Sequence, residues 1–189
     1  MAFLIAAAGL SGSGKTTALR YLKKLSAGEI VYFGGIVLEQ IRLRGLVPCP
    51  ETERSVRLDI RDQHGPAALA ILATRNVEEH LNNGVNVLID AIFVIDEYRQ
   101  IQRLRGFSRC VLLAVDACFE TRCGRLGSRA DRPLTVEQVR NRDKVEIATL
   151  RTAEVIAEAD HKIVNEGSIE MFENELELFW KKLTDSILE

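Results

Sequence analysis

The chain has 189 residues, 47% of them hydrophobic and 28% charged, which is enough to bury a substantial core and is ordinary for a globular protein. Its formal net charge of −2, with acidic and basic residues interspersed, argues against a nucleic-acid-binding tail or a membrane-surface patch. No apolar run has the length of a membrane-spanning helix. We therefore expect a single cytoplasmic domain over residues 1–189, with no nucleic-acid or membrane partner.

Apolar runs alternate with amphipathic stretches along the chain, which is typical of α/β proteins. About five buried strands are expected, at residues 3–8, 29–33, 85–90, 109–115 and 161–165. Helices are expected at residues 15–26, 36–44, 51–64, 67–82, 96–104, 118–126, 135–159 and 169–187. Because helices fill the connections, the strands should pair in parallel and form the middle layer of a three-layer α/β/α sandwich.

A glycine-rich loop follows the first strand and opens the first helix. Its sequence GLSGSGKT, at residues 9–16, matches the phosphate-binding pattern G-x-x-x-x-G-K-[ST] in full. The alternative, a chance glycine-rich turn with an exposed lysine, does not account for the strand before it and the helix after it. In such a loop, backbone N–H groups and a helix N-terminus surround the phosphates of a nucleotide, most often Mg-ATP. The residues that we expect to contact the nucleotide are Gly9, Ser11, Gly12, Ser13, Gly14, Lys15, Thr16 and Thr17.

An acidic residue, Asp90, ends the third expected strand, VNVLID. Ligands of parallel sheets bind at the carboxyl ends of the strands. We expect Asp90 to hold Mg²⁺ together with the hydroxyl of Thr16, or to act as general base toward an acceptor hydroxyl, while Lys15 reaches the β and γ phosphates. The alternative is an ordinary aspartate at a strand end.

Several arginines follow the fourth expected strand. Arg122, Arg125 and Arg129 are spaced to share one helical face if the helix extends that far, and Arg132 follows in a polar loop. Phosphoryl transfer needs cations around the migrating group, so we expect Arg125, Arg129 and Arg132 to be catalytic and residues 127–134 to form a small lid. The alternative is a solvated basic helix face, which is as good an account of Arg122.

A second arginine pair occurs in the third expected helix. Arg57 and Arg61 are four residues apart, so they share a face and have the chemistry to grip an anionic acceptor. An exposed face on which Asp59 and Asp62 neutralise these arginines explains the pattern equally well.

The chain resembles the P-loop nucleotide-kinase superfamily, in particular kinase-like proteins of unknown activity related to dephospho-coenzyme A kinase and adenylate kinase. The resemblance covers nearly the whole chain and rests on these segments: GLSGSGKTT at 9–17, IRLRGLVP at 41–48, RDQHGPAALA at 61–70, VLIDAI at 87–92, SRADRPLT at 128–135 and ADHKIVNEGS at 159–168. It implies that Asn165, Glu166 and Gly167 border the adenine of ATP. It also implies that Arg125, Arg129 and Arg132 belong to the lid region.

Two positions depart from this resemblance. Asp90 is followed by Ala91, where these relatives usually have glycine, and Gly34-Gly35 stands where they often have Gly-Asp. The preferred function is an ATP- and Mg²⁺-dependent phosphotransferase for a small nucleotide-like acceptor, such as dephospho-coenzyme A or a nucleoside monophosphate. The alternative, motivated by Gly35, is an ATP-binding regulatory or switch protein that has lost acceptor phosphorylation.

Overall fold

The computed structural model describes residues 2–104, 110–130 and 133–185, and it contains a five-stranded parallel sheet with the strand order β2-β3-β1-β4-β5. The strands are β1 (Leu4–Ala8), β2 (Glu29–Tyr32), β3 (Val87–Asp90), β4 (Cys110–Asp116) and β5 (His161–Val164). The prediction of five parallel strands is confirmed. The first strand lies in the middle of the sheet and is fully buried, which is why it is apolar at every position.

Nine helices are seen in the described part of the chain. They are α1 (Lys15–Ser26), α2 (Phe33–Leu43), α3 (Pro50–His64), α4 (Ala68–Asn82), α5 (Ile95–Gln102), α6 (Phe119–Gly127), α7 (Val136–Ala148), α8 (Thr152–Ala157) and α9 (Ile169–Asp185). Most of them begin and end within a few residues of the predicted positions. Among the described residues, no helix is both long and apolar enough to cross a membrane.

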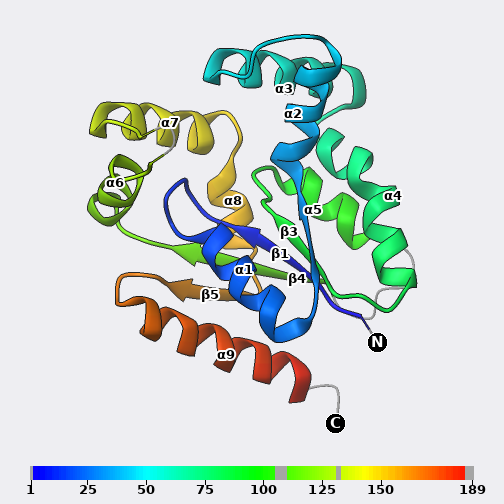
Figure 1. Cartoon of the computed structure of the whole chain (residues 1–189), viewed down its shortest axis with the longest axis vertical. Helices are drawn as coiled ribbons and strands as arrows, with labels where there is room; N and C mark the ends of the chain where they lie inside the picture. Colours follow the sequence, from blue (N-terminus) through cyan, green and yellow to red (C-terminus); the bar gives the residue numbers. More distant parts are fainter. Residues whose placement is uncertain (1, 105–109, 131–132, 186–189) are drawn as a thin grey trace.

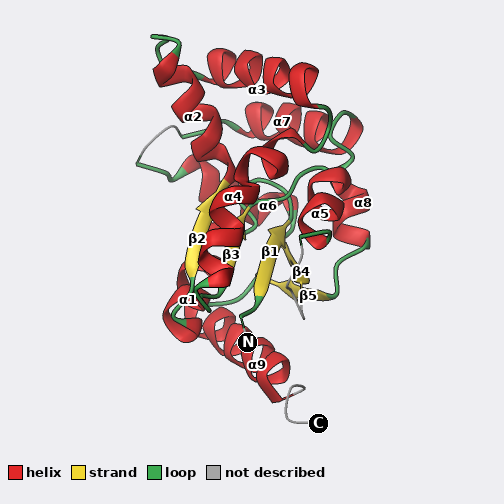
Figure 2. Ribbon diagram, turned by 90° about the vertical axis from the view of Figure 1, so that its right-hand side faces the viewer, coloured by secondary structure: helices red, strands yellow, loops and turns green. Residues whose placement is uncertain are grey.

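The helices cover both faces of the sheet (Figures 1 and 2). One apolar cluster joins alternate residues of β1, such as Ile5 and Ala7, to α1 and α9. The other cluster joins Leu4 and Ala6 to α2, α4, α5 and α8. The alternation of β1 side chains between the two clusters explains why the sandwich has three layers.

One predicted helix, residues 135–159, is wrong as a single element. It is divided into α7 and α8, and between them Arg151 has left-handed backbone angles of φ 55° and ψ 35°. Because of this break, α7 and α8 pack against different parts of the molecule. α8 buries Val155 against the sheet, whereas α7 continues to the far end of the molecule beside α6 (Figure 1). A straight helix of 25 residues would extend about 37 Å in one direction and would not reach both.

The start of α2 also differs from the prediction. The helix begins at Phe33 instead of residue 36, so Gly34 and Gly35 are helical. A Cβ atom on Gly34 would lie 2.4 Å from the ring of Tyr32, so a side chain at this position would require the exposed tyrosine ring to move.

Candidate functional site

The loop between β1 and α1 has a backbone shape that requires glycine. Gly9 has φ 140°, and a Cβ there would lie 2.2 Å from the carbonyl oxygen of Val115 on β4. Gly14 has φ 109°, and a Cβ there would lie 2.3 Å from the amide nitrogen of Asn165. Both values of φ are in the region that side chains disfavour. The pattern of glycines in the sequence is therefore explained by how closely β4 and the segment after β5 approach the loop.

No side chain of the described residues caps the N-terminus of α1. Gly14 occupies the N-cap position without a side-chain hydrogen bond, and the first turn contains no acidic residue. The first N–H groups of a helix have no partner within the helix, and they carry a partial positive charge. The end of α1 therefore offers an anion site of the kind that binds phosphate.

Lys15, the first residue of α1, is buried at the bottom of this loop with 8% of its surface exposed. Its ammonium group donates to the carbonyl oxygens of Gly9, at 2.7 Å, and Leu10, at 3.0 Å, and lies 5.3 Å from the centre of the Phe93 ring. Burial lowers the pKa of Lys15 to about 8, against the opposing effect of the nearby carboxylates of Glu146 and Asp90. Lys15 therefore loses its proton at a lower pH than an exposed lysine does.

Thr16, in the first turn of α1, meets Asp90, the last residue of β3. The Thr16 hydroxyl donates to Asp90 Oδ2 at 2.8 Å, and Asp90 is only 7% exposed. Hydroxyl and carboxylate oxygens are ligands that suit Mg²⁺, which is commonly held by one or two protein oxygens together with substrate phosphates. Among the described residues, no group of three or more His, Cys, Asp or Glu side chains is placed to hold a metal alone. The donor set thus fits an Mg²⁺ ion that arrives with a nucleotide.

The other loop side chains differ in where they point. The hydroxyl of Ser13 is buried beneath the loop, and no described residue forms a hydrogen bond with it. Thr17 is exposed on α1. The backbone N–H of Ser13 donates to the carbonyl oxygen of Leu10 at 3.2 Å within the loop.

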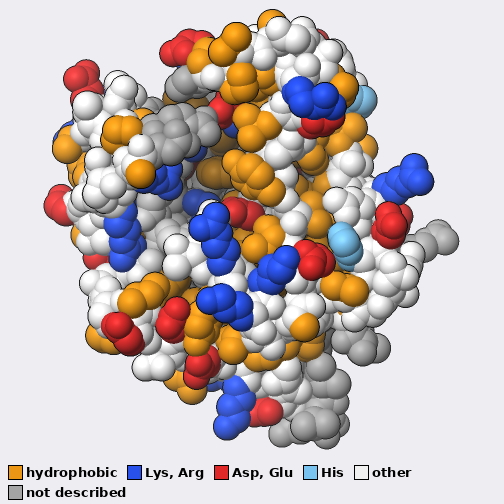
Figure 3. All heavy atoms as spheres, viewed as in Figure 1, with side chains coloured by type: hydrophobic (Ala, Val, Ile, Leu, Met, Phe, Trp, Pro, Cys, Tyr) orange, Lys and Arg blue, Asp and Glu red, His pale blue; other side chains and the backbone are white. Residues whose placement is uncertain are grey.

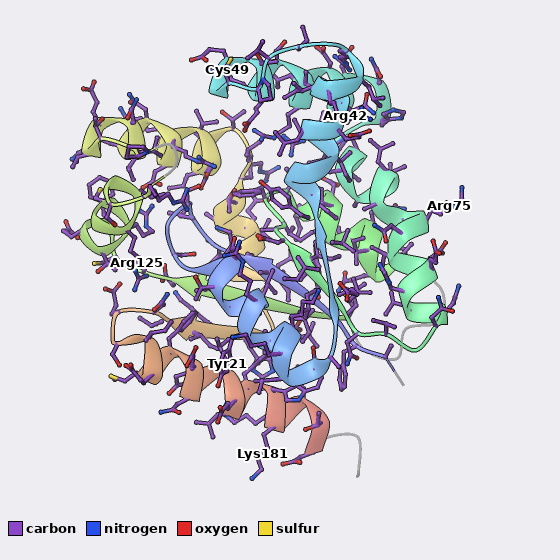
Figure 4. All side chains as sticks on the ribbon, viewed as in Figure 1. Tyr21, Arg42, Cys49, Arg75, Arg125 and Lys181 are labelled. Atoms are coloured by element: carbon purple, nitrogen blue, oxygen red, sulfur yellow. The ribbon has the colours of Figure 1, made fainter. Side chains whose placement is uncertain are left out.

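Asn165 fastens the loop to the segment that follows β5. Its side-chain amide donates to the carbonyl oxygen of Ser13 at 2.8 Å, and its own oxygens accept from Arg125 at 2.9 and 3.1 Å. Figure 4 shows Arg125 on the side of α6 that faces this segment. Glu166 accepts hydrogen bonds from the Cys118 N–H and the Thr121 hydroxyl at the start of α6. Arg125, Asn165 and Glu166 therefore form one connected border of the loop.

The condition for a shared helical face of Arg122, Arg125 and Arg129, a helix that extends to residue 129, is not met. The helix α6 ends at Gly127, so Arg129 lies beyond it on an exposed stretch and does not share a helical face with the others. Arg122 is buried and bound to Asp143 of α7 at 2.6 and 2.8 Å, and it also donates to the carbonyl oxygen of Ser11 at 3.2 Å. Arg132 lies outside the described residues. Arg122 therefore acts as a brace between the loop and α7.

Arg57 and Arg61 lie on α3, and the structure separates their surroundings. Arg61 pairs with the buried carboxylate of Glu97 on α5 at 3.0 Å. Arg57 is half-buried and forms no ion pair or hydrogen bond with another described residue, and its pKa is lowered by burial and by the neighbouring Arg61 and Arg142. Asp59, which the sequence offered as a partner, pairs with Arg44 instead. The carboxylates of Glu53 and Glu97 oppose this lowering of the pKa of Arg57.

Sequence reasoning missed two residues of α7 at this site. Glu146 is buried, accepts from the N–H and hydroxyl groups of Ser11, and pairs with Arg142 at 2.9 Å. The helix is polar on most sides, so nothing in its pattern distinguishes these two residues from solvated ones. Figure 3 shows the molecule hollowed between α7 on one side and α2 and α3 on the other, with Lys and Arg side chains along the hollow.

Comparison with known proteins agrees with this description. A family model described as an AAA domain matches residues 8–151. A UPF0200 protein from Hyperthermus butylicus is 33% identical over 183 residues, which covers 96% of this chain and 95% of the relative. A UPF0200 protein from Pyrococcus abyssi is 30% identical over 182 residues, covering 95% of this chain and 96% of the relative.

Solved structures share the fold at low identity. TT1252 from Thermus thermophilus superposes with a TM-score of 0.64 at 22% identity, covering 96% of this chain and 98% of the other. Shikimate kinase from Bacteroides thetaiotaomicron superposes with a TM-score of 0.61 at 12% identity, covering 97% and 98%. The chain belongs to the AAA domain family and, with its relatives, to the UPF0200 proteins, and it has the fold of P-loop kinases.

Proposed function

We propose that this protein transfers the γ-phosphoryl group of Mg-ATP to a small anionic acceptor. The observation that carries the proposal is the convergence of three groups at one end of the sheet. These are the uncapped start of α1, the buried ammonium of Lys15, and the Thr16–Asp90 pair with its 2.8 Å hydrogen bond. Solved kinases with the same fold add support.

The residues in and around the loop have distinct roles in this proposal. Backbone N–H groups and Lys15 bind the phosphates, and Lys15 offsets the charge that spreads over the oxygens of the migrating group. Thr16 and Asp90 would hold Mg²⁺, which supplies further charge neutralisation. Asn165, Glu166 and Gly167 border the base, and Arg125 holds Asn165 in place.

The acceptor is proposed to lie in the hollow between α3 and α7. Arg57, which has no carboxylate partner among the described residues, and the neighbouring Arg61 and Arg142 would bind its anionic group. An acceptor oxygen forms the new bond to phosphorus as the bond to the ADP oxygen breaks, and ADP leaves. If the acceptor is a hydroxyl, Asp90 is the candidate to receive its proton. A nucleoside monophosphate or dephospho-coenzyme A has the required anionic group.

A second function, an ATP-binding switch without acceptor phosphorylation, is favoured by one observation. Gly34 and Gly35, where related kinases are expected to have a carboxylate, lie in α2 under the ring of Tyr32 and offer no acidic group. In either case we propose a single cytoplasmic unit that acts on small molecules.

The proposal is tested by measuring ADP release from Mg-ATP with a panel of nucleoside monophosphates and dephospho-coenzyme A. We expect turnover with at least one acceptor, and a loss of about 10²- to 10³-fold in Lys15→Ala, because one preorganised cation is removed. The matched control is Lys24→Ala, at an exposed position of the same helix, which should leave turnover unchanged.

Two outcomes contradict the phosphotransferase. If Lys15→Ala kept both ATP affinity and turnover, the loop would not be the donor site. If ATP bound but no acceptor led to ADP release, the switch would be the better description.

A further inference from the structure

A carboxylate of α7 lies on the phosphate-binding loop. Glu146 Oε2 accepts a hydrogen bond from the Ser11 N–H at 3.0 Å, and Glu146 Oε1 accepts one from the Ser11 hydroxyl at 2.6 Å. The carboxylate is 3% exposed, and it belongs to a residue 135 positions away in the sequence. Ser11 is one of the loop residues whose N–H and hydroxyl groups are expected to serve a nucleotide.

The surroundings of this carboxylate are those of an anion site. Its charge acts on Lys15, where it is the strongest of the effects that favour the ammonium form. Arg142, one helical turn earlier on α7, donates to Oε1 at 2.9 Å. Two loop donors and two nearby cations are also what an oxygen of a bound phosphate would require. A buried carboxylate is costly without such partners, so the contact is specific.

A second contact holds α7 against the same peptide. Arg122 donates to the Ser11 carbonyl oxygen at 3.2 Å and is bound through two hydrogen bonds to Asp143 on α7. The N–H of Ser11 thus contacts Glu146 directly. The carbonyl oxygen of Ser11 is linked to Asp143 through Arg122. A change at Ser11 is therefore transmitted to α7 at two points one turn apart.

We propose that Glu146 is an internal competitor of the nucleotide, which occupies the place of a phosphate oxygen on the loop and must leave before the terminal phosphates bind. This inference rests on the proposed binding of ATP at the loop. Phosphate and carboxylate are both anionic, so they do not share these donors, and entry of the nucleotide drives Glu146 away. Its departure releases Arg142, which is then available to the phosphates or to the acceptor. The position of α7 thereby reports whether the loop holds a nucleotide.

The test compares the affinities of wild type, Glu146→Gln and Glu146→Ala for Mg-ATP and for inorganic triphosphate, by titration calorimetry. We expect both variants to bind both ligands more tightly, by about tenfold for Glu146→Ala, because the competing anion is gone. Glu146→Gln keeps the size of the side chain and removes its charge, so it should bind more tightly than wild type even if the alanine variant folds poorly. Thermal unfolding of each variant checks the fold.

The matched control is Glu137→Gln on the first turn of the same helix, where the side chain is exposed. It removes the same charge and should leave both affinities unchanged. If the wild type binds ATP and turns over, but neither Glu146 variant binds the ligands more tightly, the proposed competition is overturned. Failure of wild type and variants alike to bind either ligand would overturn the ATP site itself, and the competition with it. If Glu137→Gln raised the affinity for these ligands as much as Glu146→Gln did, the gain would come from the change in net charge alone. This result would also contradict the inference.

Discussion

Lys15 is subject to opposing influences on its charge. Burial lowers its pKa to about 8, whereas Glu146 and Asp90 favour the ammonium form. Between pH 8 and the ordinary value of 10.5, the side chain is therefore largely neutral in the folded protein although it would be charged in the unfolded chain. A phosphate at the loop needs the ammonium form, so binding above pH 8 must be accompanied by the uptake of a proton.

This gives a prediction for the pH dependence of nucleotide affinity. The affinity for Mg-ATP should be nearly constant below pH 8 and should fall at higher pH, approaching about tenfold for each pH unit. Calorimetric titration between about pH 6.5 and 9.5 measures it. In Lys15→Met any residual affinity should not change over the same range. An equally flat profile in the wild type would mean that the ammonium group does not contribute to binding.

Residues of the loop could be placed from the sequence because their arrangement is local. The motif at residues 9–16 specifies the loop, and the end of a parallel strand specifies where Asp90 meets Thr16. Arg142 and Glu146 could not be placed in the same way. Their contacts depend on how α7 docks, and docking is set by Arg122 and Asp143, which no spacing rule relates to one another.

At the scale of the elements, the break between α7 and α8 was the main failure of prediction. The residues around position 150 contain neither glycine nor proline, so local propensity indicates a continuous helix. A tertiary contact ends the helix. Thr152 is buried and donates to the carbonyl oxygen of Phe93, and Arg151 adopts a left-handed backbone conformation. The end of α6 at Gly127, by contrast, lies within one residue of the predicted end at residue 126.

The break leads to a prediction about glycine substitutions. Arg151→Gly should leave the free energy of unfolding unchanged or raise it by up to about 1 kcal/mol, because glycine adopts left-handed angles without strain. The exposed pair that Arg151 forms with Glu154 contributes little. Lys144→Gly, at an exposed position inside α7, should instead lower the free energy of unfolding by about 1 kcal/mol. Denaturant unfolding compares the two. An equal loss in both variants would mean that the segment is a continuous helix in solution.

At the scale of the whole molecule, a buried ion pair joins α3, at the top of Figure 1, to α5. Arg61 of α3 is 14% exposed and binds Glu97 of α5, whose side chain is 1% exposed. Burial raises the pKa of Glu97, and the neighbouring Arg61 opposes this rise. Without Arg61, the buried negative charge of Glu97 would lose the positive charge that stabilises it.

Arg61→Met should therefore be destabilised by about 3–5 kcal/mol at pH 7. This decrease in the free energy of unfolding should become smaller as the pH falls. At lower pH Glu97 takes up a proton in the folded state, so the variant no longer contains an uncompensated buried charge. Urea unfolding at about pH 7 and pH 5 measures both values. Arg44→Met, which breaks the more exposed pair with Asp59, should cost at most about 1 kcal/mol at either pH. A loss in Arg61→Met that did not depend on pH would contradict the role given to Glu97.

The position of β1 in the middle of the sheet has a consequence for how the protein is made. The phosphate-binding loop follows β1 directly, but the partners of β1 come much later in the chain, because Leu4 is paired with Val87 of β3 and with Cys110 of β4. The atoms that confine Gly9 and Gly14 belong to Val115 and Asn165. A chain emerging from the ribosome therefore has the loop sequence long before it has the walls that shape the loop. Affinity for nucleotide should therefore appear only after the chain has been made through Asn165, so that a chain truncated before this residue does not compete for ATP.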